Sequence, residues 1–285
     1  MSYNYSEGLS PYENKGKVGL KEVFESEESV TKKVKELAEW VRSANHVVVH
    51  TGAGISTSAG IPDFRYDYHK CSRGFVLHEF SIIFYLNKSS YMSGKYLDVF
   101  NVLMLLPFVN RGPNGVWTLE KKGLKPEVNI SFDDALPTKT HMALLELIKA
   151  RKIHYIVSQN IDGLHLKSGL LRNYISELHG NMFIEKCNVC KRQYVRKSAT
   201  SSVGQKCLNV PCPSTKVNGR ACRGKLYDTI LDWEHDLPEK DLKMADYHSS
   251  IADISICLGT TLQIVPSAIV KNLYNSQRSW TETTS

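Results

Sequence analysis

A glycine-rich loop behind an apolar run constrains the fold of this chain more than any other feature. Residues 45–50 read Asn-His-Val-Val-Val-His, and the loop after them carries Gly52 and Gly54. A strand that ends in such a loop is typical of an open parallel sheet, which presents its loops to a ligand at the carboxyl ends of the strands. Because glycine has no Cβ, this backbone can approach a phosphate closely. We interpret it as a nucleotide-binding loop, although Thr57 and Ser58 stand in place of the third glycine of the dinucleotide fingerprint.

Two further apolar segments predict more strands of the same sheet. Residues 153–157 read Ile-His-Tyr-Ile-Val, a mainly apolar run that predicts burial on both faces, and residues 253–258 form a similar run. Helices are expected from Ser26, where apolar residues follow at helical spacing, and behind Pro137, where Thr138 is the expected cap. Strands that alternate with helices in this way predict an α/β fold with a doubly wound, Rossmann-like parallel sheet.

Composition narrows the classes of protein. With 285 residues the chain is long enough for one sizeable domain and a small module. A formal charge of +7 favours acidic partners such as nucleic acid or chromatin, and a solvated basic surface without a specific partner is the alternative. The longest apolar stretch, residues 99–109, is far shorter than the roughly 18 residues of a membrane-spanning helix. The first residues lack a basic start and an apolar core, so we expect neither a membrane partner nor a secretory signal.

The cysteines predict a metal site. Seven cysteines in a chain without a predicted secretory signal are read as reduced thiols and metal ligands in the cytosol or nucleus. Cys187 and Cys190 form a Cys-x-x-Cys pair, which can place two thiolates on one tetrahedral zinc ion. Two more ligands would come from Cys207, Cys212 and Cys222, and spacing alone does not choose among them. Four thiolates leave no open position for a substrate, so the zinc would be structural.

Three longer motifs point to a known family. They are GAGISTSAGIPDFR at residues 52–65, SQNIDGLH at residues 158–165 and LHGN at residues 178–181. As a set they strongly resemble the sirtuins, the NAD-dependent protein deacylases. The segments at 112–118 and 228–238 are similar to the chromatin-associated type-6 branch of that family. The resemblance spans about residues 1–65 and 112–267.

The resemblance implies a reaction that consumes NAD. The acyl oxygen of a modified lysine attacks the nicotinamide ribose as nicotinamide leaves. By resemblance, His179 is the general base that activates a ribose hydroxyl, and Asn160 and Asp162 hold the carboxamide. Trp233 and Glu234 would line the groove in which an extended peptide adds as a strand. The implied NAD contacts are Ala53, Thr57, Phe64, Arg65, Trp117, Gln159, His179, Gly259, Thr260 and Thr261.

The resemblance also favours one ligand set for the metal. Residues 220–224, RACRG, look like the fourth-ligand motif of the type-6 branch, and Cys212 falls nearest the third ligand. The implied zinc ligands are Cys187, Cys190, Cys212 and Cys222. The same branch implies acylated histone tails and chromatin as partners, a nuclear location, and mono-ADP-ribosyl transfer as a further activity that the family allows.

Domain boundaries follow from these motifs, with two departures from the family. We expect a polar arm at 1–25, a Rossmann-like NAD-binding domain at 26–180 and 224–285, and an inserted zinc-binding module at 181–223. Residues 66–111 interrupt the cofactor-binding motif and show no clear helical or strand period, and we interpret them as a retained intron or gene-model error rather than an added lid. After residue 267 the sequence leaves the family pattern, so we expect the sheet to be truncated at its C-terminal end, with an unpaired strand edge.

Two functions from different classes remain open. The first is an NAD-dependent protein-lysine deacylase of the histone deacetylase type, which the catalytic motifs favour. The second is a catalytically impaired isoform that acts as a zinc-bearing chromatin or nucleotide binder, which the interrupted loop favours. A dehydrogenase is disfavoured, because neither a cysteine ribbon nor an Asn-x-Asp pair is expected there.

Overall fold

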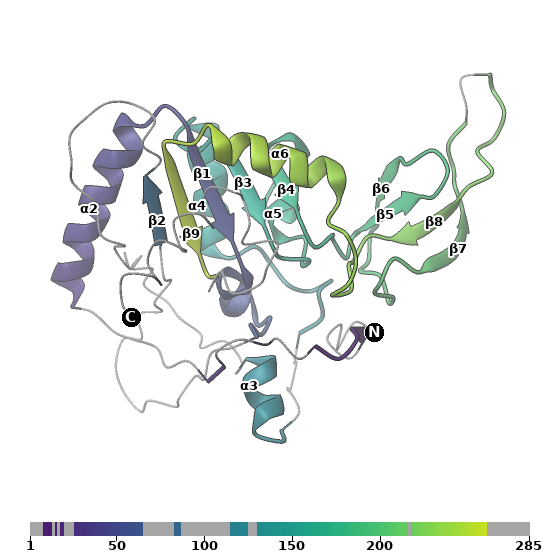
Figure 1. The fold of residues 1–285 in the computed structure, drawn as a ribbon, viewed down its shortest axis with the longest axis horizontal. Coiled ribbons are helices and arrows are strands. Elements are labelled where there is room, and N and C mark those ends of the chain that lie inside the picture. The colour runs from purple at the N-terminus through teal and green to yellow at the C-terminus, as the bar shows by residue number, and fades with distance from the viewer. Residues whose placement is uncertain are drawn as a thin grey trace, which may run out of the picture.

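The chain folds around two β-sheets of different size, which lie side by side (Figure 1). This computed structural model describes residues 8–12, 15, 18–19, 26–64, 83–86, 115–124, 130–215 and 218–260. The larger sheet has five strands in the order β2-β9-β1-β3-β4. Its strands are β1 (Val47–Thr51), β2 (Ile83–Leu86), β3 (Tyr155–Ser158), β4 (Ile175–Glu177) and β9 (Ile254–Leu258).

The centre of the larger sheet is parallel, as the apolar runs predict. β1 pairs in parallel with β3 on one side and with β9 on the other, and β4 extends the sheet beyond β3. Every residue of β1, β3 and β9 is buried. A strand with helices on both sides has no solvent-facing surface, which explains why these runs are mainly apolar on both faces.

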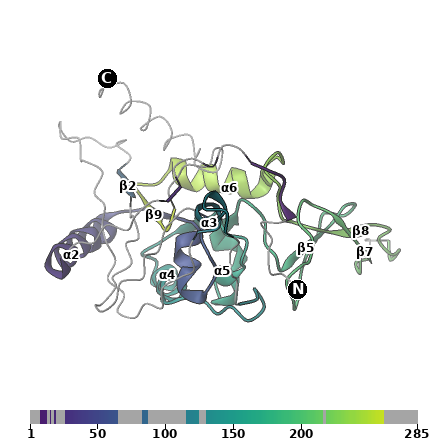
Figure 2. The ribbon, with the colours of Figure 1, turned by 90° about the horizontal axis from the view of Figure 1, so that it is seen from below.

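Helices cover both faces of this sheet, so the doubly wound prediction is confirmed. Figure 2 shows α6 on one side of the sheet and α4 and α5 on the other. Residues of α2 and α4 share a core with Val47 and Val49, whereas Ala245 of α6 packs with Val48. The helices are α2 (Glu27–Ser43), α3 (Val116–Lys121), α4 (Lys139–Lys149), α5 (Leu164–Lys167) and α6 (Glu239–Ser250), with 3-10 turns η1 (Ala53–Ala59) and η2 (Arg172–Tyr174).

Side-chain caps begin the two helices that the sequence predicts. The hydroxyl of Ser26 accepts a hydrogen bond from the backbone N–H of Ser29 at the start of α2. Thr138 caps α4 in a capping box, in which the imidazole of His141 accepts in return from the backbone N–H of Thr138. Both caps satisfy N–H groups that have no partner within the helix, so the helix starts are confirmed. No helix among the described residues is long and apolar enough to cross a membrane.

The smaller sheet and its loops hold Cys187, Cys190, Cys207, Cys212 and Cys222, and the sheet extends beyond the expected module. Its strands, in the order β6-β5-β8-β7, are β5 (Ile184–Cys187), β6 (Gln193–Val195), β7 (Cys207–Pro211) and β8 (Lys225–Asp228). The expected boundary at residue 223 excludes β8, yet β8 pairs antiparallel with both β5 and β7. The small sheet therefore extends to Asp228 through a pairing that no local motif reveals, and the domain boundaries themselves stay predictions.

The two segments that flank the insertion lie side by side. The backbone N–H of Val116 donates to the carbonyl of Asp63 over 2.8 Å, and that of Trp117 donates to the carbonyl of Phe64 over 2.9 Å. Within the insertion, β2 pairs antiparallel with β9. The sequence shows no clear strand period in this segment, yet a short strand adds to β9 through its backbone, so that β2 forms the edge of the sheet on this side. The other residues of 66–111, and 261–285, lie outside the described residues.

Candidate functional site

A cleft lies where the loops after β1, β3 and β9 meet. Parallel strands end at the same edge of a sheet, so loops far apart in sequence converge there. The cleft has a volume of about 150 Å³. Residues predicted from the sequence that line it are Ala53, Phe64, Gln159, Asn160, Asp162, His179, Trp233, Gly259 and Thr260.

The glycines of the first loop allow it to pack directly on the loop after β9. The N–H of Gly54 donates to the carbonyl of Gly259 over 2.9 Å, and Gly259 itself has a φ of +59°. A Cβ on Gly52 would lie 2.6 Å from the carbonyl oxygen of Gly259, and a Cβ on Gly54 would lie 2.8 Å from its Cα. Such distances exclude any side chain. The contact with Gly259 at the cleft wall therefore requires glycine at both positions, and the predicted approach to a phosphate stays a prediction.

Asn160 and Asp162 tie the loop after β3 to the glycine loop. The amide of Asn160 donates to the carbonyl of Gly52 over 3.0 Å. The carboxylate of Asp162 accepts from the hydroxyl of Ser56 at 2.6 Å and from the N–H of Leu164 at 2.9 Å. Both side chains are buried while still lining the cleft. The sequence analysis missed Ser56, whose signal was a hydroxyl inside the glycine loop.

His179 lines the same cleft in a form suited to accept a proton. Its Nδ1 lies 2.9 Å from the carbonyl oxygen of Gln159. A carbonyl oxygen only accepts hydrogen bonds, so Nδ1 carries the hydrogen and Nε2 keeps its lone pair. Burial lowers the pKa of His179 below its ordinary value, although the hydrogen bond with Gln159 opposes this shift. The imidazole is therefore neutral at pH 7, which is the state a general base requires.

Aromatic rings form one wall of the cleft. The ring of Trp233 stacks on Tyr12 with centroids 4.5 Å apart and lies 5.7 Å from the ring of Trp117. Trp117 is also 4.7 Å from Phe64. Leu9 and Tyr12, which belong to the expected polar arm, both line the cleft. The sequence analysis missed these two residues. Their apolar side chains within a polar segment could have pointed to them.

Five predicted site residues do not line the cleft or cannot be placed. Thr57 is buried in η1, where its hydroxyl donates to the carbonyl of Gly54 over 3.1 Å. Trp117 is buried against Phe64 and Trp233 and is not among the cleft residues. Glu234 is exposed to solvent and is not among the cleft residues. Arg65 and Thr261 lie outside the described residues, so their roles, like those of the other site residues, stay predictions.

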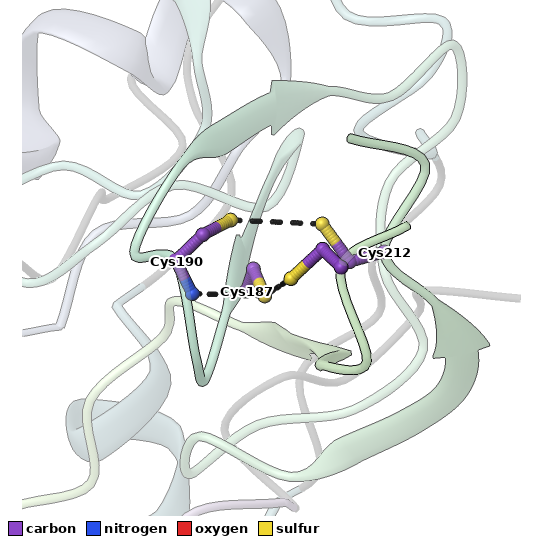
Figure 3. A group of neighbouring side chains, drawn as sticks. Cys187, Cys190 and Cys212 are labelled. Atoms are coloured by element: carbon purple, nitrogen blue, oxygen red, sulfur yellow. Dashed lines mark hydrogen bonds between the residues drawn. The ribbon is translucent and has the colours of Figure 1, made fainter. Parts of the chain in front are cut away.

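Four cysteines of the small sheet form a cluster that fits a tetrahedral metal. The sulfurs of Cys187, Cys190, Cys212 and Cys222 all lie within 4.8 Å of one another. Cys187 and Cys222 are 3.8 Å apart at sulfur, and Cys190 and Cys212, which face each other in Figure 3, are 3.7 Å apart. Zinc–thiolate bonds of about 2.3 Å at tetrahedral angles give sulfur separations of about 3.8 Å. The donor set and its spacing therefore fit zinc.

The tertiary structure decides the choice that cysteine spacing left open. Cys212 belongs to the cluster, whereas Cys207 is half-exposed on β7 and lies outside it. Gly224 has a further role here, because a Cβ at this position would lie 2.3 Å from the sulfur of Cys187. The glycine of the RACRG segment thus leaves room for the first ligand.

The structure combines a parallel doubly wound sheet, a small sheet with a cysteine cluster, and a cleft lined by a histidine. This combination defines one class of protein. The sequence profile described as Sir2 family matches residues 120–266. Together with a relative that is 52% identical, this match shows that the chain belongs to the Sir2 family.

The relatives are named as deacetylases. The chain is 52% identical to "NAD-dependent protein deacetylase Sirt6" of Drosophila melanogaster, over 94% of this chain and 70% of that protein. It is 40% identical to "NAD-dependent protein deacetylase SRT1" of Oryza sativa subsp. indica, over 94% of this chain and 45% of that protein. It is 37% identical to "NAD-dependent protein deacetylase sirtuin-7" of Rattus norvegicus, over 86% of this chain and 49% of that protein. The chain thus spans less than half of the rice and rat proteins.

Solved structures agree on the fold. A Sir2 protein with a deacetylated p53 peptide and 3'-O-acetyl ADP-ribose superposes with a TM-score of 0.50 and 22% sequence identity. The match covers 85% of this chain and 82% of the other. At this identity the likeness concerns the fold alone.

Proposed function

We propose that this chain is an NAD-dependent protein-lysine deacylase that acts on acylated histone tails, with mono-ADP-ribosyl transfer as a further activity. One observation carries the proposal: His179, Asn160 and Asp162 line a single cleft together with the glycine loop. The family membership and the names of the relatives support the reaction class. NAD is consumed in this reaction and supplies the ribose carbon that receives the acyl oxygen as nicotinamide leaves.

The buried polar groups of the cleft suit the nicotinamide end of NAD. The carboxylate of Asp162 already accepts two hydrogen bonds, but each of its oxygens has a second lone pair that can accept from a carboxamide NH₂ group. Because Ser56 and Leu164 hold this carboxylate in place, it needs no reorganisation when a ligand arrives. Asn160 is held in the same way by Gly52. The backbone of the glycine loop and of Gly259 would face the pyrophosphate.

His179 is the base in this proposal. With Nδ1–H bonded to the carbonyl of Gln159, its Nε2 is free to take the proton of a ribose hydroxyl. That proton transfer lets the hydroxyl oxygen form a bond to the former carbonyl carbon of the acyl group. The bond between this carbon and the lysine nitrogen then breaks as the nitrogen is protonated, and the lysine leaves as the free amine. The aromatic wall beside Trp233 keeps water away from the reacting atoms.

Zinc would have a structural role in the cysteine cluster. Four thiolates complete a tetrahedral shell and leave no position for substrate. The cluster draws its ligands from both ends of the module, so a bound ion would hold the small sheet together.

Charge supports chromatin as the setting and the nucleus as the location. The chain carries a formal charge of +7, and the exposed cations Lys186, Lys191 and Arg192 lie near the cysteine cluster. An extended acylated peptide would add beside Trp233 and Glu234. Acidic surfaces of nucleosomes and DNA are the partners that such a charge balance favours.

The test measures nicotinamide release from NAD in the presence of an acylated histone peptide. We expect release over many turnovers by the full chain and none above background with the unmodified peptide. We expect a loss of steady-state release of about 10²-fold or more with His179→Ala, because turnover stops when the product of the first step cannot react further. Binding of NAD to both forms is measured in parallel by calorimetry. Binding of NAD or nucleosomes without any release would instead support the impaired-isoform function.

A further inference from the structure

A buried hydrogen bond brackets the turn that carries His179. The amide Nδ2 of Asn181 donates to Oε1 of Glu177 over 2.6 Å, which links the residues two positions before and two positions after the histidine. Glu177 is 4% exposed and Asn181 is 1% exposed. A side-chain bond across a turn of this length restricts the backbone between its ends, and so restricts the direction of the imidazole.

Arg172 and Asp241 connect this hydrogen bond to α6. The guanidinium of Arg172 donates from Nη2 to Oδ1 of Asp241 over 2.6 Å, and its Nε lies 3.7 Å from Oε2 of Glu177. The same oxygen of Asp241 accepts from the backbone N–H of Glu177 over 3.1 Å. Asp241 lies in the first turn of α6 and is buried. A continuous network thus runs from α6 through Arg172 and Glu177 to Asn181.

The turn separates two cavities. His179 lines the cleft, whereas Gly180 and Asn181 line a second cavity of about 300 Å³, and the two cavities share no lining residue. Arg172, Glu177 and Asp241 also line the second cavity. The network therefore reaches the catalytic turn from the side of the second cavity, and its side chains do not line the cleft.

We propose that Arg172, Glu177 and Asp241 are positioning residues, which hold the His179 turn so that the imidazole faces the ribose. The inference rests on the proposed function. Buried ion networks add little stability compared with apolar residues of the same volume, but they hold hydrogen-bonded groups in one geometry. A displacement of about 1 Å at a catalytic group can lower a rate by about 10²-fold.

The protonation state of Glu177 determines how firmly the network holds the His179 turn. Burial raises the pKa of Glu177 to about 7, against the opposing effects of Arg172 and of the hydrogen bond from Asn181. The ionised carboxylate binds both partners, whereas the protonated form weakens the ion pair, so the network loosens as the pH falls below 7. The charged groups that act on this carboxyl are Arg172, Asp241 and Asp162.

Because the two steps of the reaction occur in sequence, two assays together separate the step that needs His179 from the step before it. Nicotinamide leaves before the base acts, so exchange of labelled nicotinamide into NAD reports the first step, and deacylation reports both steps. Variants that move only His179 should slow deacylation and spare exchange. We would compare Glu177→Gln, Asp241→Asn and Arg172→Met with wild type, using the full chain and an acylated histone peptide.

A surface ion pair on α6 provides the matched control. Lys243 and Glu239 form an exposed pair over 2.5 Å, so Lys243→Met removes a charge from the same helix without touching the network. We expect this control to behave as wild type in both assays.

For Arg172→Met we expect deacylation to fall about 10- to 100-fold while exchange and the KM for NAD stay within about 3-fold. For the isosteric Glu177→Gln we expect a smaller loss that is greater at pH 8 than at pH 6, because only wild type gains the ionised carboxylate. If Arg172→Met does not fold, Glu177→Gln and Asp241→Asn decide the outcome. Equal losses of exchange and deacylation, or unchanged deacylation, would overturn the inference. A wild-type chain without either activity would instead refute the proposed function.

Discussion

Gly180 gives the sharpest test of how the catalytic turn is packed. Its φ is +89°, and a Cβ at this position would lie 2.0 Å from the carbonyl oxygen of Thr229. Thr229 belongs to the backbone that leads to the predicted peptide groove, and its hydroxyl donates to the carbonyl of Asn181 over 3.0 Å. The substitution Gly180→Ala therefore forces two backbone segments apart directly beside His179.

The expected size of the effect follows from two costs. A left-handed backbone costs a residue with a Cβ about 1–2 kcal/mol. An ordinary contact begins at 3.4 Å, so the segments must also separate by more than 1 Å, which brings the total loss of unfolding free energy to about 2–4 kcal/mol. In a chain of this size that lowers Tm by about 5–15 °C. A shift of about 1 Å at His179 predicts a loss of deacylation of about 10²-fold.

Gly123→Ala is the matched control. Gly123 has a φ of +70°, but a Cβ at this position would have no atom within 4 Å, so this variant has the backbone cost without the clash. Thermal unfolding and peptide deacylation are measured for both variants below the Tm of the weaker one. If Gly180→Ala matched Gly123→Ala in both Tm and deacylation, the argument from packing against Thr229 would be refuted.

Three further predictions concern the metal, the buried histidines and the insertion. We expect metal analysis to find zinc in the wild type and in Cys207→Ser but not in Cys222→Ser, and the reverse would disprove the ligand set. Burial lowers the pKa of His50 to about 4 and that of His165 to about 3, so unfolding takes up protons below the ordinary value of 6.5. Stability is then complete above pH 6.5 and falls by up to ~1.4 kcal/mol per pH unit per histidine as the pH drops towards 4. Urea unfolding of His50→Leu between pH 7 and 5 should show a shallower slope than wild type, and an equal slope would contradict this reasoning. Removing residues 66–111 should raise deacylation, because the hydrogen bond from Val116 to Asp63 already joins the ends, and should lower Tm because β9 loses its pairing with β2. A shortened chain no more active than the full one would show that the insertion does not impair the loop.

Local patterns in the sequence were enough to predict the main elements of the larger sheet. Continuous apolar runs mark the buried strands β1, β3 and β9, and hydroxyl caps at Ser26 and Thr138 mark the helix starts. These features depend on interactions between residues that are close in the chain, so short sequence patterns are enough to predict them. The motifs around Asn160 and His179 likewise identified the residues that meet in the cleft.

The sequence by itself determined the strands, the helix caps and the identity of the motif residues. Only the tertiary structure decided that Cys212 rather than Cys207 joins the cluster, that β8 completes the small sheet, and that β2 lies against β9. It alone joined Arg172, Glu177 and Asp241 behind the catalytic turn. The physical reason is that these contacts depend on how strands register and pack across long stretches of chain, and short-range spacing carries no information on either.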